Sequence, residues 1–388
     1  MTRMPELTVR PVHSIASVDQ SAWNALDHGD SPFLEHAFLR ALEDSASVGV
    51  RAGWEPVYLL AETSSPVGHA SLVGAVAGFV KSHSFGEYIF DFAWARASHR
   101  AGIPYFPKLV VAAPMTPATG PRLLVAPGAE RERVQDALVA ALHEVADARG
   151  CSSIHLLFVT DAERRALERR GFAARSSLQF HWQSAGYDSF DDFTSALVSR
   201  KRKQIRKERR RARAAIDRLD FVSGDAMTGA DVAALDRFYR ATVAAHGGMD
   251  YLRPGFFERY LELAPGRVRF ARAVRDDLAV AGALFLEKGR ALYGRYWGAD
   301  VGAEFLHFEV AYYAAIEHCI ARGLEVFEAG AQGEHKLLRG FSPVITNSAH
   351  WIRDPDLSRA VSEFLAEEAR AVSVQARELR AYLPYKQA

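Results

Sequence analysis

Apolar positions in the first half of the chain have the spacing of helices that alternate with strands. In residues 32–45, PFLEHAFLRALEDS, the side chains of Phe38, Leu39 and Leu42 share one face of a predicted helix. A longer helix is predicted over residues 133–150, where the final glycine is a favourable C-terminal cap. Strands are predicted for the apolar runs PVYLLAE, SLVGAVAGFVKS, GEYIFDF, SIHLLFV and FAARSSLQFHWQ.

The second half of the chain repeats this order of elements. Three successive strands are predicted for RVRFARAV, LAVAGALFLEKG and RALYGRYWG. A helix follows over about residues 304–322, and then the strand LEVFEAG. Residues 357–383 have the pattern of a helix, which we expect to dock on the second half. This mixture of strands and helices is typical of an α/β or α+β sandwich.

Two phrases line up between the halves. Residues 148–172 read ARG, the strand CSSIHLLFV, a charged insert and RGF, and residues 321–341 read ARG, LEVFEAG, a charged insert and RGF. Single tripeptides recur by chance, but this ordered pair lies within a shared strand–helix–strand pattern and indicates an internal duplication. The first insert is TDAERR and the second is GAQGEHK, so we expect the chemistry in the second copy.

A strongly basic segment, RKRKQIRKERRRAR at residues 200–213, lies between the halves. Its residue types favour a helix about 21 Å long. Because Ile205 is its one strongly apolar residue, the helix is not expected to bury a face. It then either bridges two domains in solvent or binds an anion, and Glu208 is the one acid available for pairing along the helix. The cations expected to bind phosphate are Arg202, Lys203, Arg206, Lys207 and Arg210.

The composition is that of an ordinary globular protein long enough for two domains. The 388 residues are 49% hydrophobic and 24% charged with a net charge of +1, so an anion site must come from local clustering. Cys151 and Cys319 have no CxxC neighbour, which argues against a metal site or a disulfide framework. The N-terminus lacks a signal-peptide core, and the apolar run at residues 70–80 is too short to cross a bilayer. We expect a soluble cytoplasmic protein without a membrane span.

An acid interrupts the apolar stripe of the helix predicted at residues 304–322. That stripe is formed by Leu306, Tyr313, Ile316 and Ile320. Glu309 falls on the same face, where a carboxylate is costly unless it is paired or used. Burial raises the proton affinity of a carboxyl group, which suits a general base near neutral pH. The alternative is a structural Glu309 bonded to Arg295 or to a tyrosine hydroxyl.

The predicted strand RALYGRYWG places polar and aromatic side chains on one face. By alternation, Tyr293, Arg295 and Trp297 point to the same side of the sheet. Such a face is either an exposed sheet surface or the wall of a polar pocket, and its spacing does not decide between them. The three residues are therefore substrate-binding candidates.

The segment that follows LEVFEAG gathers glycines, an acid, an imidazole and two cations. Gly330 and Gly333 allow a ligand to approach the backbone closely. Lys336 and Arg339 are candidates for holding a phosphate or carboxylate of a substrate. The candidates for proton transfer are Glu309, Glu334 and His335. The alternative for this segment is a charged surface turn.

Several catalytic motifs are absent from the sequence. It contains no GxxxxGK[ST] loop, no HExxH, no paired Cys/His ligand spacing and no GxSxG elbow. The Arg/Gln-x-x-Gly-x-Gly/Ala loop that cradles the coenzyme A pyrophosphate in acetyltransferases is also missing.

Five segments together resemble a bacterial family. They are PFLEHAFLRALEDS, PYFPKLVVAAPMTPATGPRLL, RKQIRKERR, FLHFEVAYYAAIEHCIARGL and EAGAQGEHKLLRGFSPVITNSAHW. In this order, over about residues 32–351, the chain is similar to the FemAB-like peptidoglycan biosynthesis/recognition family of GNAT-like acyltransferases. The resemblance implies two tandem GNAT-like domains, each a mixed, mostly antiparallel sheet flanked by helices. We place these domains at residues 1–183 and 216–388, joined by a basic helical connector at 184–215.

The resemblance also bears on the donor and on further site residues. The stretch RKQIRK is similar to the Arg/Lys-rich segment of Fem-type transferases, which use aminoacyl-tRNA instead of coenzyme A. The missing coenzyme A loop agrees with that branch. Tyr105 and Lys108, in the matching segment PYFPKLVV, join the substrate-binding candidates.

The sequence therefore predicts an N-acyltransferase without a metal, whose active site lies in the second domain between the sheet and the helix at residues 304–322. An acyl or aminoacyl group would pass to an amine acceptor such as a peptidoglycan precursor. Its co-substrate would be aminoacyl-tRNA or an acyl-coenzyme A. Two alternatives stay open: a non-catalytic protein that binds cell-wall fragments or RNA, and an acyl-coenzyme A-dependent N-acetyltransferase with an atypical loop.

Overall fold

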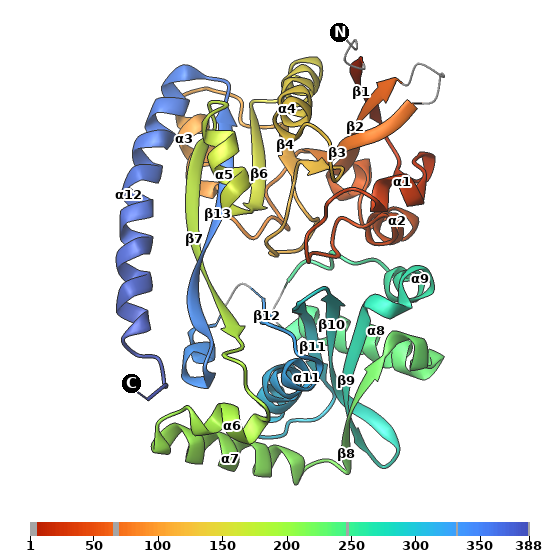
Figure 1. Ribbon diagram of the computed structural model, residues 1–388, viewed down its shortest axis with the longest axis vertical. Helices are drawn as coiled ribbons and strands as arrows, with labels where there is room; N and C mark the ends of the chain where they lie inside the picture. The colour runs from red at the N-terminus through yellow and green to blue at the C-terminus, as the bar shows by residue number, and fades with distance from the viewer. Residues whose placement is uncertain (1–5, 65–69, 246–247, 331–332, 387–388) are drawn as a thin grey trace. The chain divides into compact units, whose positions relative to one another are not determined.

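The computed structural model describes the chain with short gaps, over residues 6–64, 70–245, 248–330 and 333–386 (Figure 1). The chain divides into two compact units. Unit 1 comprises Met1–Ser177 and Thr346–Val372, and unit 2 comprises Leu178–Ile345 and Ser373–Ala388. Two of the boundaries fall inside strands, because β7 (Ala173–Gln183) and β13 (Ser342–Ile352) each begin in one unit and end in the other.

Unit 1 is built on strands in the order β1-β2-β3-β4-β6-β13, with β5 paired to β3. The pair β4–β6 is parallel and the other neighbouring pairs are antiparallel. Besides β13, the strands are β1 (Leu7–Val12), β2 (Trp54–Ser64), β3 (Ala70–Lys81), β4 (Lys108–Val111), β5 (Leu124–Val125) and β6 (Ser153–Val159). The helices are α1 (Gln20–Asn24), α2 (His36–Asp44), α3 (Phe92–Arg100), α4 (Arg131–Ala148), α5 (Asp161–Glu168), the first part of α12 (Pro355–Arg380), and the 3-10 turns η1 (Ile15–Ser17) and η2 (Val50–Ala52).

The core of unit 1 forms where α4 lies on the sheet. Leu138 and Leu142, four residues apart on one face of α4, are fully buried against apolar side chains of the strands. Those strand residues include Leu59 of β2 and Leu156 of β6, each on the face of its strand that points to α4. Burial of such side chains contributes about 1.5–3 kcal/mol each, so the α4 contact accounts for much of the stability of this unit.

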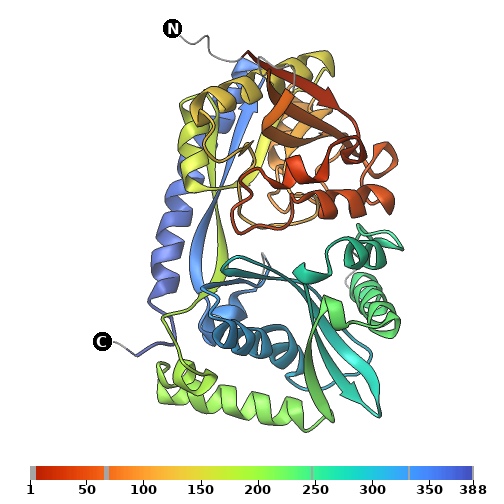
Figure 2. The ribbon, with the colours of Figure 1, turned by 45° about the vertical axis from the view of Figure 1, so that its right-hand side comes forward.

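Unit 2 has the strand order β7-β12-β11-β10-β9-β8, with β11–β12 parallel and the other pairs antiparallel. Figures 1 and 2 show α11 on one face of these strands and α8 with α9 on the other. The strands besides β7 are β8 (Arg218–Ser223), β9 (Val268–Arg275), β10 (Leu278–Lys288), β11 (Ala291–Ala299) and β12 (Val326–Glu328). The helical elements are α6 (Phe190–Ser195), α7 (Ser199–Arg213), η3 (Gly224–Ala226), α8 (Gly229–Ala245), α9 (Phe256–Leu263), η4 (Pro265–Arg267), α10 (Leu306–Phe308), the π-helical turn η5 (Glu309–Tyr313), α11 (Ala314–Arg322) and the 3-10 turn η6 (Glu334–Arg339).

The two units repeat one order of elements. In each, a helix connects two parallel strands, α4 between β4 and β6 and α10–α11 between β11 and β12. The insert and a glycine with positive φ follow, Gly171 (+84°) before β7 and Gly340 (+88°) before β13. The strand that ends each repeat then pairs with the other repeat: β7, which follows β6, pairs with β12, and β13, which follows β12, pairs with β6. The predicted fold class, mixed sheets flanked by helices in tandem, is confirmed.

One prediction about an individual element is wrong, and another holds only in part. The run GEYIFDF is not a strand but an irregular loop before α3, because Gly86 (φ +79°) and Tyr88 (φ +60°) have left-handed backbone that a strand does not contain. The predicted docking of the C-terminal helix on the second half holds only for its last part, where Leu379 and the following Leu383 pack against the core of unit 2. The helix begins on unit 1. Its residues Leu357, Val361 and Leu365 pack in an apolar cluster of unit 1. Across the described ranges, no helix is long and apolar enough to cross a membrane.

Candidate functional site

The candidate site lies in unit 2, between the strands β10 and β11 and the helical segment formed by α10 and η5. A cavity of about 120 Å³ is found there, and its walls include Arg295, Trp297, His307 and Tyr312. Ala329, directly after β12, also lines it. A π-helical turn such as η5 is rare and frequently marks a functional site. This is the location that the sequence predicts for substrate, between the sheet and the helix at residues 304–322.

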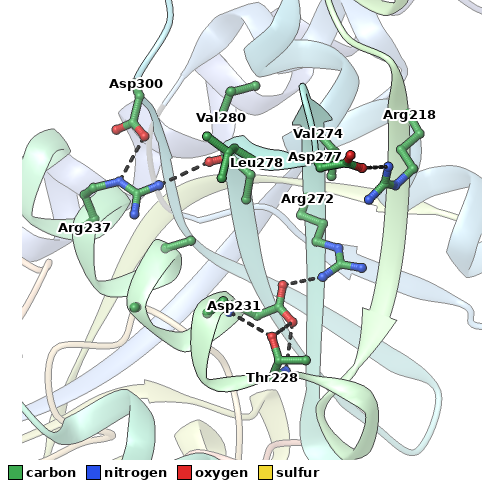
Figure 3. Close-up of a pocket in the computed structure, with 14 residues that line it drawn as sticks. Arg218, Thr228, Asp231, Arg237, Arg272, Val274, Asp277, Leu278, Val280 and Asp300 are labelled. Atoms are coloured by element: carbon green, nitrogen blue, oxygen red, sulfur yellow. Dashed lines mark hydrogen bonds and ion pairs between the residues drawn. The ribbon is translucent and has the colours of Figure 1, made fainter.

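A larger cavity of about 670 Å³ occurs elsewhere in unit 2, between α8 and the strands β8, β9 and β10 (Figure 3). Each of its arginines is held by a carboxylate, in the pairs Arg218–Asp277 (3.2 Å), Arg237–Asp300 (2.9 Å) and Arg272–Asp231 (2.5 Å). None of the predicted site residues lines this cavity. Because its charges are satisfied among themselves, we assign the candidate site to the smaller cavity.

The strand β11 carries one extra residue beside the smaller cavity. Leu284 of β10 pairs with Tyr296, whereas the next residue, Phe285, pairs with Gly294, so Arg295 forms a β-bulge. The strict alternation predicted for Tyr293, Arg295 and Trp297 is therefore wrong across this point. Arg295 and Trp297 both line the cavity, and Tyr293 is buried in the sheet without lining it.

Aromatic rings form one wall of the cavity. The His307 ring lies 5.0 Å from the Trp297 ring and 5.1 Å from the Tyr312 ring, measured between centroids. The Tyr312 hydroxyl and His335 Nε2 are 3.0 Å apart, within hydrogen-bond distance. Burial, followed by the positive charges of Arg339 and Lys336, lowers the pKa of His335. Burial likewise lowers the pKa of His307 to about 4, so both imidazoles are neutral at neutral pH.

The loop after β12 depends on its glycines. Gly330 and Gly333 have φ angles of +81° and +111°, and a Cβ on Gly333 would lie 2.5 Å from the His335 ring. Residues 331–332 and the side chain of Glu334 lie outside the described residues. Lys336 is 1% exposed and donates a hydrogen bond to the Gly330 carbonyl at 2.8 Å. Burial and the nearby Arg295 charge lower its pKa to about 7.

Arg339 ties the same loop to the basic helix. It is buried, and its guanidinium donates to Glu208 Oε2 at 3.0 Å and lies 3.4 Å over the Phe308 ring. Glu208 also accepts a hydrogen bond from the Tyr313 hydroxyl at 2.5 Å. The one acid of α7 thus pairs with distant residues and not with the basic side chains along its own helix.

Glu309 is fully buried, as the apolar stripe predicts, but its partners differ from the expected ones. Its carboxylate accepts hydrogen bonds from Arg209 Nε at 3.0 Å and Arg213 Nε at 2.8 Å. The expectation of Arg295 or a tyrosine hydroxyl as the partner is therefore wrong. Charge-assisted pairs of this kind fix α7 against η5.

The basic helix does bury a face, contrary to the prediction. Ile205, Glu208 and Ala212, at spacings of three and four residues, are each at most 2% exposed. The reason is that Glu208 and Glu309 neutralise cations at this contact, so the helix does not need a broad apolar stripe. Of the predicted phosphate-binding residues, Lys203, Arg206, Lys207 and Arg210 are exposed and Arg202 is half-buried.

Pairing across β7, β12 and β11 brings three more polar residues into one row. Glu328 of β12 lies opposite His181 of β7 on one side and Tyr293 of β11 on the other. His181 is buried, and burial with the charges of Lys336 and Arg295 lowers its pKa to about 3. His181 in this row is therefore close enough to both Arg295, which lines the cavity, and Lys336 for their charges to act on it.

The two candidates in unit 1 belong to a separate buried network. Lys108 is 0% exposed and donates to Ser84 Oγ and Glu87 Oε2, each at 2.9 Å, and to Asp91. The Tyr105 hydroxyl donates to Asp91 Oδ2 at 2.6 Å. The three ammonium hydrogens of Lys108 are thus used inside unit 1, and substrate binding by Tyr105 and Lys108 stays a prediction.

The residues that sequence reasoning missed are His307, Tyr312, Glu208 and His181. His307 and Tyr312 are five residues apart, and a regular helix separates such positions by about 140°. The π-helical turn η5 brings their rings together, and a search for 3.6-residue spacing does not find such pairs. His181 had no local signal, because its neighbours come from strands more than a hundred residues away.

Comparison with known proteins agrees with the fold. A family model named FemAB-like and described as peptidoglycan biosynthesis/recognition matches residues 14–387. The solved structure of FemX is similar over 91% of this chain and 100% of its own, with 12% identity and a TM-score of 0.53. The C-terminal domain of a putative lysylphosphatidylglycerol synthetase from Agrobacterium fabrum is similar over 91% and 97%, with 12% identity and a TM-score of 0.51. A comparison with curated sequences finds no match. The family match spans nearly the whole chain, and the protein belongs to the FemAB-like family.

Proposed function

We propose that this chain is an N-acyltransferase that moves an aminoacyl or acyl group onto an amine, with an aminoacyl-tRNA as the preferred donor. The observation that carries the proposal is the Tyr312–His335 pair at the wall of the unit 2 cavity. Membership of a family described as peptidoglycan biosynthesis/recognition supports a peptidoglycan precursor as the acceptor. Since aminoacyl-tRNA is a cytoplasmic molecule, we propose that the reaction takes place in the cytoplasm.

The reaction needs one proton transfer on each side of the reacting carbonyl. The acceptor nitrogen attacks the ester carbon of the donor, so a C–N bond forms and the C–O bond to the donor alcohol breaks. The nitrogen loses one proton and the leaving oxygen gains one. Tyr312 lines the cavity and its hydroxyl is 3.0 Å from His335 Nε2, so the two side chains form a relay. The lowered pKa of His335 keeps its imidazole ready to accept the proton.

Positive charge beside the cavity would stabilise the oxyanion of the tetrahedral intermediate. Arg295 lines the cavity, and its bulge position sets it apart from the regular ladder of β11. Lys336 lies close enough for the two positive charges to interact. We propose that the acyl oxygen lies near Arg295 and that Lys336 adjusts the field there through its own protonation.

Glu309 and the cysteines are assigned no chemical step. The Glu309 carboxylate is bonded to Arg209 and Arg213, so we propose that it positions α7 and is not the base. Cys151 and Cys319 are buried, and burial raises the pKa of Cys151 to about 11 and that of Cys319 further. Neither thiol is suited to form an acyl intermediate.

The donor would be held by the solvent face of α7. Arg200, Lys203, Lys207 and Arg210 are exposed, take no part in an ion pair within the described parts of the chain, and lie three or four residues apart on one face. This stripe is opposite the buried face of Ile205, Glu208 and Ala212. Four phosphate contacts predict a slope of about −3 to −4 in log affinity against log salt concentration.

The direct test is transfer of a labelled amino acid from aminoacyl-tRNA to a panel of amine-bearing peptidoglycan precursors, followed by mass spectrometry. We expect product with the wild type and a kcat lower by about 10²–10⁴-fold for Tyr312→Phe and His335→Gln. Exposed Tyr382, far along the chain from the site, supplies the matched control Tyr382→Phe, which should retain full activity.

Binding measurements separate the other readings. Equal affinity for charged and uncharged tRNA would reduce the role of α7 to a phosphate contact. Binding of coenzyme A with no binding of tRNA would overturn the proposed donor in favour of an acyl-coenzyme A. Binding of precursor or RNA without any transfer would overturn catalysis itself.

A further inference from the structure

Three exposed phenylalanines gather on unit 1 and take no part in the candidate site of unit 2. Phe85, Phe90 and Phe92 are 45%, 51% and 38% exposed. The Phe90 and Phe92 rings stack at 5.4 Å, and the Phe85 ring lies 6.2 Å from that of Phe92. Large apolar side chains that cluster on an open surface are a sign of an interaction site, whereas single exposed ones are ordinary.

The loop that carries these rings is held from beneath, so they cannot withdraw into the core. Glu87 and Asp91, in the same loop, are each 3% exposed and pair with the buried Lys108. Arg175 donates to the Phe90 carbonyl at 3.0 Å. Separating such buried pairs is costly, so the loop keeps the phenylalanines in solvent. The buried network therefore supports a fixed display of rings.

The adjoining surface is positively charged. On α3, Phe92, Arg96 and Arg100 follow one another at intervals of four residues and are all exposed, so they form one row. Neither arginine takes part in an ion pair within the described ranges. The sequence contains no Asp or Glu from residue 92 to residue 129, so no acid of this long segment offsets the charge.

We propose that Phe85, Phe90, Phe92, Arg96 and Arg100, here called the α3 patch, dock unit 1 on an anionic phospholipid surface. The phenyl rings would enter the boundary between headgroups and acyl chains, and the two guanidinium groups would meet the lipid phosphates. The rings carry no hydrogen-bonding group, and Phe90 and Phe92 are already stacked on each other. Both features favour insertion into the apolar part of a membrane over recognition of the bases of single-stranded RNA.

Vesicle co-sedimentation of the whole chain tests the proposal. Vesicles of phosphatidylglycerol mixed with phosphatidylcholine should bind the wild type, and pure phosphatidylcholine should bind it at least about tenfold more weakly. The variant F90S/F92S should weaken binding to the anionic vesicles about tenfold, because both rings leave the apolar phase. R96Q/R100Q should do so by a similar factor and should make the residual binding insensitive to salt.

Phe364 supplies the matched control. It is 42% exposed on α12 and lies outside the α3 patch, so F364S removes the same kind of side chain and should bind vesicles as the wild type does. Equal binding to neutral and anionic vesicles, or an equal loss in F364S, would overturn the proposal. So would absence of vesicle binding together with polyuridylate binding that F90S/F92S weakens. The readout involves no acyl transfer, so its outcome is independent of the proposed reaction.

Discussion

The segment after β6 in unit 1 and the segment after β12 in unit 2 occupy the same place in the repeated order of elements, yet they use charge differently. In unit 1 the buried Glu163 of α5 accepts hydrogen bonds from the backbone amides of Arg122 and Leu123, the shortest at 2.6 Å. In unit 2 the buried Lys336 of η6 donates to the Gly330 carbonyl. Both inserts therefore place an ionisable side chain in the interior, where it forms hydrogen bonds with backbone groups.

The difference is in how completely each charge is satisfied. The Glu163 carboxylate has three hydrogen bonds and joins two elements of unit 1, which is a structural task. Lys336 takes part in no ion pair within the described ranges, and its pKa is lowered to about 7. A group with such a pKa changes charge near neutral pH, as chemical groups in active sites commonly do. Of the two equivalent inserts, the one in unit 1 is structural, whereas the one in unit 2 contains a lysine whose charge changes near neutral pH.

The largest expected effect is on the free energy of unfolding and concerns Glu163 in unit 1. Replacing Glu163 with Ala leaves two buried amides without an acceptor, so we expect the free energy of unfolding to fall by about 2–5 kcal/mol. Urea unfolding measures this loss. Glu168→Ala removes an exposed acid from the same helix and should change stability by less than about 0.5 kcal/mol. A loss in Glu163→Ala as small as that of the control would break the comparison.

Lys336→Met should alter the pH dependence of stability. The pKa of Lys336 is about 7 in the folded chain against 10.5 ordinarily, so the unfolded chain binds more protons between these values. Wild-type stability therefore gains up to about 1.4 kcal/mol per pH unit from this residue as the pH rises above 7. The variant lacks this gain, so its stability relative to the wild type should be highest near pH 7 and fall toward pH 9.

Unfolding curves of the wild type and of Lys336→Met at pH 7, 8 and 9 give the difference in their free energies of unfolding at each pH. Lys81 in unit 1 also has a pKa lowered to about 7, but it is present in both proteins and cancels. A difference that does not vary with pH would mean that Lys336 titrates normally.

Glu309→Gln should destabilise the chain moderately and leave the pH profile of turnover unchanged in shape. The amide keeps one acceptor for Arg209 or Arg213 but loses the charge, so we expect a cost of about 1–3 kcal/mol. Loss of the limb of the kcat–pH profile assigned to a base would instead identify Glu309 as that base.

The smallest effect on stability is expected on the solvent face of α7. Lys203→Gln combined with Lys207→Gln should change the free energy of unfolding by less than about 0.5 kcal/mol, because both side chains are exposed. The salt dependence of tRNA binding should become shallower by about two units of slope. An unchanged slope would remove α7 from the donor site.

Elements with a strong local pattern were predictable from the sequence. The helix predicted at residues 133–150 is α4 (Arg131–Ala148), and the basic segment at 200–213 is α7 (Ser199–Arg213). Three successive strands in the second half are β9, β10 and β11. In all of these the apolar spacing or the helix propensity of the segment itself decides the conformation.

What could not be predicted depends on partners far away in the sequence. Glu309 meets Arg209 and Arg213 about a hundred positions earlier, and nothing in its own helix identifies them. The loop GEYIFDF has the apolar content of a strand, but Glu87 and Asp91 turn inward to Lys108. The bulge at Arg295 arises from pairing with β10, which a period of two along one strand does not reveal.

The exchange of the last strands has a consequence for the order of synthesis. The strand that covers the edge of β6 is β13, and its partner residues for β6 begin at Asn347, long after the Met1–Ser177 part of unit 1 has been synthesised. Until then β6 presents unpaired backbone groups on a strand whose side chains are all buried in the finished protein. Unit 1 is therefore completed only after the residues between β6 and β13 have been made, and the open edge of β6 can pair with another chain during that interval.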